Sequence, residues 1–103
     1  MCLVHPDMRW LALLVVLAAC ACATEPPPAA ELASARAAVE QAGAASAQHA
    51  PSELSAARTK LKRAQDAAAR GDNLQARRLA EEAEVDARLA WAMSENERLR
   101  PPR

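Results

Sequence analysis

The residue with the most specific chemistry in this sequence is Cys20, which follows Leu17, Ala18 and Ala19 at the end of an apolar run. The small side chains of the two alanines let a peptidase approach the backbone, and Leu17 suits an apolar pocket. The thiol of Cys20 is a nucleophile that can take up a diacylglycerol group. These residue types therefore suit a processing site that is followed by a modified cysteine.

The apolar run over residues 10–19 has the dimensions of a signal sequence. It is too short for a bilayer-spanning helix, which needs about 20 residues, but it suits the central region of a signal peptide. Arg9 supplies the positive charge that normally precedes this region. The alternative interpretation is an ordinary secretory signal that is cleaved near Ala21 or Ala23, in which case Cys20 carries no lipid.

The segment Leu17-Ala18-Ala19-Cys20 resembles the lipobox of bacterial lipoproteins. This resemblance implies a lipoprotein signal peptide over residues 1–19 and a membrane anchor on Cys20, in which each buried methylene group contributes about 0.8 kcal/mol. Residue 21 is alanine and not aspartate, which in such lipoproteins favours export to the outer membrane. We therefore expect a protein of the bacterial cell envelope, lipid-anchored in the outer membrane and facing the periplasm.

Composition limits what residues 20–103 can do. They carry 12 basic and 12 acidic residues, so no net electrostatic field attracts nucleic acid. Consecutive prolines at 26–28 favour an extended stalk, which we assign to residues 20–30. Cys22 is the only thiol left beside the acylated one, so no internal disulfide forms. Alanine supplies most of the apolar content, so we expect modest stability, helped by tethering, self-association or a partner.

Helical patterns fill residues 31–100, which we expect to form one domain. Apolar residues recur there at alternating spacings of three and four, which places them on one face of each helix. Short loops between consecutive helices imply antiparallel neighbours. The fold class is therefore all-α, a small alanine-rich antiparallel three-helix bundle, with a helical hairpin as the alternative. The expected helices are Ala29 to about Gln48, a second that Ser52 caps and Gly71 ends, and a third from Asp72 or Asn73 to about Leu99.

The third predicted helix carries two apolar strips on roughly opposite sides. Such a helix either sits between neighbours or offers one strip to a partner. Trp91 is the only aromatic residue after Cys20, and it either fills the bundle where alanine leaves space or takes part in an interaction. The main strip holds Ala76, Leu79, Ala80, Ala83, Ala87, Ala90 and Trp91, and the second strip holds Leu74, Val85, Leu89 and Ala92.

Basic residues are concentrated on the second predicted helix. Residues 53–70 contain five basic and two acidic residues, whereas residues 72–100 contain five basic and seven acidic residues. These opposite net charges favour packing of the two helices against each other. The alternative is that the basic side chains contact peptidoglycan or anionic lipid head groups. The candidate residues for that contact are Arg58, Lys60, Lys62 and Arg63.

A succession of short motifs runs through residues 29–95. They are Glu31-Leu32-x-x-Ala35-Arg36, Ala50-Pro51-Ser52-Glu53-Leu54, Ala57-Arg58-x-x-Leu61, Gly71-Asp72 and the run from Ala76 to Ala90. Their order resembles the domain-of-unknown-function 4398 family, which is found in small bacterial lipoproteins. The resemblance implies a helical module of the envelope and brings no activity. Longer members continue into an OmpA-like peptidoglycan-binding domain, which this sequence, ending at Arg103, does not contain, so we do not carry peptidoglycan binding over.

The residue types give no support for catalysis. His49 stands at the end of a predicted helix, and the serines have no partner set for nucleophilic chemistry. Glu81, Glu82, Glu84 and Asp86 fan around a helix without converging, so we expect no metal and no other cofactor. We expect a non-enzymatic module with a structural or protein-interaction role, which binds another envelope protein or itself. The alternative is a direct binder of peptidoglycan or anionic lipid through the basic second helix.

Overall fold

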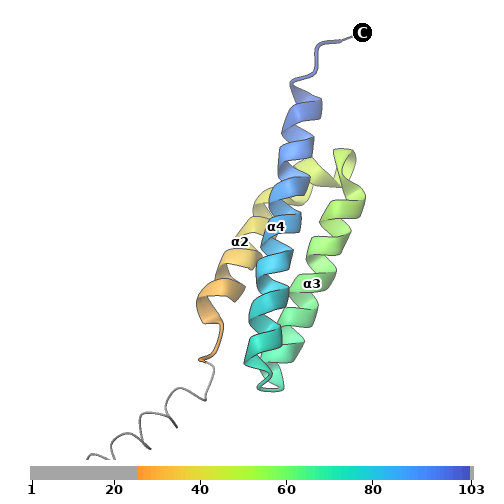
Figure 1. Ribbon diagram of the computed structural model, residues 1–103. Helices are drawn as coiled ribbons and strands as arrows, with labels where there is room; N and C mark the ends of the chain where they lie inside the picture. Colours follow the sequence, from red (N-terminus) through yellow and green to blue (C-terminus); the bar gives the residue numbers. More distant parts are fainter. Residues whose placement is uncertain (1–25, 103) are drawn as a thin grey trace, which may run out of the picture.

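The computed structural model describes residues 26–102, and three helices account for most of them. Helix α2 spans Ala29–His49, α3 spans Pro51–Ala69 and α4 spans Asn73–Arg98. The three helices lie side by side (Figure 1), with α3 antiparallel to the other two, so that α2 and α4 run in the same direction. The predicted all-α three-helix bundle is confirmed.

The core of the bundle consists mainly of alanine methyl groups. The buried apolar residues are all alanines apart from Pro28, Val39 and Leu54. Helix α4 contacts both other helices more extensively than α2 and α3 contact each other. Alanine has no side-chain atom beyond Cβ, so its rows let the helix axes come close together. Larger side chains such as Leu32, Leu61 and Leu79 lie only partly buried at the edges of this core.

The corner between α2 and α3 consists of a single residue, Ala50, which is buried. Pro51 ends α2 as predicted, but it also occupies the first turn of α3. Proline suits this position because its fixed φ is already helical and its missing N–H has no partner there to lose. The prediction that Ser52 caps α3 is therefore wrong: its hydroxyl instead donates to Glu53 Oε2 at 2.9 Å.

The turn between α3 and α4 follows the predicted capping chemistry. Gly71 adopts a positive φ of 78°, which glycine reaches without steric cost. The Gly71 N–H donates to the Ala68 carbonyl at 3.0 Å and the Asp72 N–H to the Ala67 carbonyl at 2.9 Å, the paired bonds of a Schellman motif. The Asp72 carboxylate then caps α4 by accepting from the Gln75 N–H at 3.4 Å.

The start of α2 is attached to the start of α4. Arg77 Nε donates to Glu31 Oε1 at 3.1 Å, and Arg77 Nη2 donates to the carbonyl oxygen of Pro26 at 3.2 Å. Pro28 is buried, and its carbonyl accepts from the Leu32 N–H at 2.9 Å. The last prolines before the bundle are therefore held against its side.

Candidate interaction surface

The face of α4 that points away from α2 and α3 carries large apolar side chains in contact with solvent. We call this the outer face of α4. The second apolar strip predicted from the sequence lies on it, and no part of the described chain covers it. Its large side chains retain these exposed fractions: Leu74 57%, Val85 64%, Leu89 50%, Met93 40% and Leu99 76%.

The arrangement of α4 follows from the sizes of its side chains. The inner face is a row of completely buried alanines, at Ala76, Ala80, Ala83, Ala87 and Ala90. A leucine or valine in that row would push the helix axes apart, so the large apolar residues lie on the opposite side. Charged residues such as Arg78 and Glu82 separate Leu74 from the apolar residues between Val85 and Leu99. An exposed apolar patch such as the one from Val85 to Leu99 is typical of a site for a protein partner.

Trp91 does not fill the core of the bundle. It retains 40% exposure, and the buried row continues through Ser94, whose hydroxyl donates to the Ala90 carbonyl at 2.8 Å. Trp91 lies about four helical turns beyond Arg77, and therefore on the same side of α4. Arg77 pairs with Glu31 of α2, so Trp91 flanks the outer face on the α2 side. Of the two interpretations of Trp91, the one in which it fills the bundle is therefore wrong, because the indole keeps this exposure beside the buried row.

The basic residues predicted to form a contact surface on α3 are divided between two roles. Lys60 Nζ lies 2.7 Å from Asp86 Oδ2 and 3.7 Å from Glu82 Oε2. Arg58, Lys62 and Arg63 are exposed. Lys60 therefore joins α3 to the acidic α4, whereas the other three predicted residues are exposed on α3, where Lys62 also lies 3.8 Å from Asp66.

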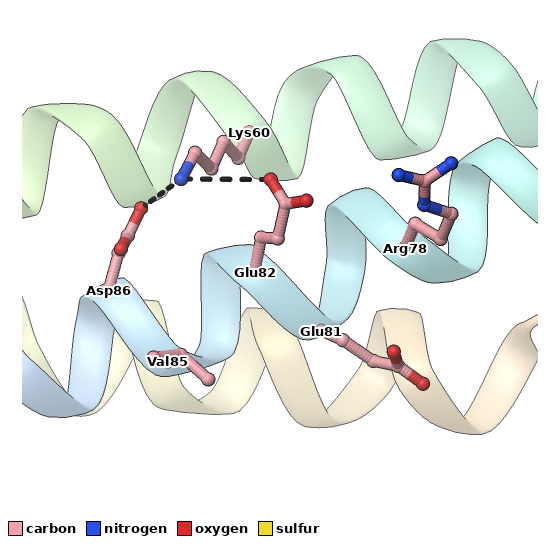
Figure 2. Close-up of a pocket in the computed structure, with 6 residues that line it drawn as sticks. All are labelled: Lys60, Arg78, Glu81, Glu82, Val85 and Asp86. Carbon is pink, nitrogen blue, oxygen red and sulfur yellow. Dashed lines mark ion pairs between the residues drawn. The ribbon is translucent and has the colours of Figure 1, made fainter.

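A shallow groove of about 320 Å³ lies where α3 and α4 meet around Lys60 (Figure 2). Ion pairs from Lys60 to Asp86 and Glu82 cross it. Three of its charged residues, Lys60, Glu82 and Asp86, pair with one another across it, so these contacts join α3 to α4. Its lining residues are Lys60, Arg78, Glu81, Glu82, Val85 and Asp86.

The Lys60–Asp86 contact compensates for a shielded charge. Oδ2 of Asp86 is closed off from solvent, and the ammonium group of Lys60 is the opposite charge that faces it at 2.7 Å. Hydrogen bonding with Asp86 raises the pKa of Lys60 above its ordinary value of 10.5. Lys60 therefore stays charged throughout the physiological pH range. The spacing of residues within α4 alone does not predict this contact, because it joins two helices.

No group of potential metal ligands is found among residues 26–102. No three histidine, cysteine, aspartate or glutamate side chains in this range gather in a way that could hold a metal ion. His49 is exposed in the last turn of α2. None of the helices in the described part of the chain combines the length and the apolarity needed to cross a membrane.

The predicted lipidation site, Cys20, lies outside the described residues, as do the other three lipobox residues, Leu17, Ala18 and Ala19.

The sequence of the bundle was compared with known protein families, curated proteins and solved structures. The family model described as Domain of unknown function (DUF4398) matches residues 30–100, which covers all of α3 and α4 and almost all of α2. No curated protein and no solved structure gave a match to this chain.

Proposed function

The chain belongs to the DUF4398 family, and from this premise we propose that it is a lipid-anchored helical module of the bacterial cell envelope. It acts by binding protein through the outer face of α4, and it has a structural role and no catalytic one. The anchor is the lipid on Cys20, and the expected location is the periplasmic side of the outer membrane.

The observation that carries this proposal is the distribution of large and small apolar residues on α4. The bundle buries alanines, whereas Val85, Leu89 and Leu99 each keep half or more of their surface in water. Burying one such side chain completely contributes about 1.5–3 kcal/mol. A partner that covers this face therefore gains more apolar contact per residue than the core of the bundle does.

The orientation of the bundle supports an anchored protein. The described chain begins at Pro26, beside the first turns of α2 and α4, whereas α4 ends at the opposite end of the bundle (Figure 1). A lipid on Cys20 therefore lies near the end of the bundle where α4 begins, and α4 extends from there away from the membrane. The outer face of α4 stays accessible to proteins in the periplasm.

The first test is the intact mass of the mature protein purified from the membrane fraction. We expect a species that begins at Cys20 and carries acyl groups, and we expect Cys20→Ser to remove both the acylation and the membrane association. Cys22→Ser is the matched control and should change neither. A species that starts after residue 20 without acyl mass would refute the anchor.

The second test places a photoreactive amino acid on the outer face, at position 89, in the full chain in cells. The matched control carries the same group at position 55, which is exposed on α3. We expect a discrete protein adduct from position 89 and none from position 55. Equal labelling at the two positions, or no adduct at position 89, would contradict a binding role for this face.

The alternative proposal is a direct contact of α3 with peptidoglycan or anionic lipid. It is favoured by the exposure of Arg58, Lys62 and Arg63 and weakened by the pairing of Lys60 within the bundle. An electrostatic contact weakens steeply with ionic strength, whereas apolar helix packing does not. Sedimentation of the Cys20→Ser protein with isolated envelopes should therefore fall in about 0.5 M salt under the alternative and stay unchanged under the main proposal.

A further inference from the structure

Four residues of the outer face of α4, together with Leu99 directly after its last residue, follow the spacing of a coiled coil. We call Val85, Leu89, Ala92, Asn96 and Leu99 the outer seam. They are separated by four, three, four and three residues, the repeat with which two helices wind around each other. All five are exposed, and four of them are apolar. From this seam, and resting on the function proposed above, we infer that the partner is a second copy of the chain, paired in parallel through α4.

Charges beside the seam fit a second copy. In a parallel pair, the residue before Asn96 faces the residue five positions later on the other helix. Extended two residues beyond the end of α4, this rule brings Glu95 of one copy toward Arg100 of the second copy, and symmetry forms the contact twice. Within one chain, Glu95 pairs with Arg98 at 2.7 Å and Arg100 with Glu97 at 3.4 Å. Such exposed pairs contribute little and exchange easily.

The one polar residue of the seam specifies how the copies align. Asn96 occupies a position that is normally apolar, and a single asparagine there favours two parallel helices in register, because its amide then meets the same amide of the other copy. A shifted or antiparallel pairing would set this amide against an apolar side chain. The seam ends at Val85 toward the N-terminus, because the next positions in the repeat are the charged residues Glu82 and Arg78.

The fold and the anchor compensate for the shortness of the seam. Two heptads form a weak contact between separate peptides, but α4 is already helical because its inner face packs against α2 and α3, so no helix has to nucleate on association. Copies that are anchored in one leaflet through their N-termini have α4 pointing in the same direction. Confinement to a surface also raises their effective concentration.

The test is disulfide crosslinking of the full chain in its membrane. Cys22→Ser removes the neighbouring thiol, and Ala92→Cys or Asn96→Cys then places one thiol in the outer seam. Ser55→Cys on the exposed side of α3 is the matched control. We expect mild oxidation to give a disulfide-linked dimer for both seam positions and not for the control. Absence of the dimer at both seam positions, or equal dimer from the control, would overturn the inference.

A charge exchange identifies the second copy specifically. Glu95→Arg alone or Arg100→Glu alone sets like charges against each other, and each should lower dimer yield from the seam cysteine about five-fold. When the Glu95→Arg chain and the Arg100→Glu chain are expressed together, a dimer of one chain of each kind again sets opposite charges against each other. The yield of this mixed dimer should therefore return to that of the unaltered pair. Mixed and unmixed dimers in equal yield would exclude the parallel alignment.

The outcomes separate this inference from the proposed function. An acylated chain that gives no dimer overturns the second copy and leaves the anchor standing. An acylated chain whose seam crosslinks to a different protein overturns the second copy and leaves the interaction role. An unacylated chain that still dimerises through the seam cysteine, and not in the Ser55→Cys control, refutes the anchor and supports the seam, whereas an unacylated monomer counts against both.

Discussion

Leu54 is the residue whose truncation should damage the bundle most. It is 2% exposed and is the largest fully buried side chain among residues 26–102. Leu54 lies in the first turns of α3 and belongs to a buried cluster that includes Val39 from α2 and Ala87 from α4. Its side chain therefore joins all three helices just below the corner at Ala50.

The free-energy cost of Leu54→Ala can be worked out from this environment. Three carbon atoms leave the core, and at about 0.8 kcal/mol each the lost transfer free energy is about 2.4 kcal/mol. Most of the surrounding side chains are alanines that cannot extend into the space, so a cavity remains and the total reaches about 3–4 kcal/mol. Domains of this size have only about 3–5 kcal/mol of stability. The variant should therefore lie close to its unfolding midpoint without denaturant.

The measurement is urea unfolding of the purified protein, followed by helical circular dichroism. Leu74→Ala is the matched control, because the same atoms are removed from a helical leucine that is 57% exposed. We expect the control to change the free energy of unfolding by less than about 0.5 kcal/mol. A loss below about 1 kcal/mol for Leu54→Ala, or equal losses for the two variants, would refute the conclusion that Leu54 holds the helices together.

Three further predictions concern turns, buried hydroxyls and pH. Gly71→Ala should destabilise the bundle by about 1 kcal/mol because of the positive φ of this residue. Gly43→Ala should stabilise it by about 0.5–1 kcal/mol, because an added Cβ meets nothing within 4 Å there. Thermal melts of the two variants measure both effects. Ser46→Ala should raise the free energy of unfolding by about 1 kcal/mol because its buried hydroxyl has no hydrogen-bond partner. Ser94→Ala should not, since that hydroxyl is bonded within α4; equal effects in urea titrations would contradict this difference. The raised pKa of Lys60 means that its ion pair stabilises fully below pH 10.5 and is lost as the pH rises through the raised value. The stability difference between the natural protein and Lys60→Met should therefore be constant from neutral pH to about 9 and shrink above about 10.5, and a difference that grew there would contradict the assignment.

The helices and their order could be predicted because their signals are local. Alternating spacings of alanine and leucine, Pro51 after His49, and Gly71 before Asp72 each act within one or two turns. The Ser52 cap failed because proline beside it was interpreted only as a terminator. Proline at the first helical position starts a helix as readily as it ends the preceding one.

The details of the candidate surface depend on distances between helices, which spacing along one helix cannot supply. Trp91 was grouped with the buried alanines because hydrophobicity was counted without side-chain volume. The close approach that the alanines permit leaves Ser94, and not the indole, in the buried row. Lys60 could be predicted to pair with the acidic helix, but only the packing of α3 on α4 identifies Asp86 as its closest contact.

Arg77 donates hydrogen bonds to Pro26 and Glu31, and these contacts limit how far the bundle can extend from an N-terminal anchor. If the proposed lipid is on Cys20, the six residues 20–25 can span at most about 20 Å when fully extended. Helix α4 has 26 residues and adds about 39 Å. The tip of the bundle therefore works within about 60 Å of the lipid surface. Under the proposed anchor, Arg77→Ala would remove the hydrogen bond that holds Pro26 and would lengthen that reach, so this guanidinium group helps to set how far from the lipid the outer face of α4 extends.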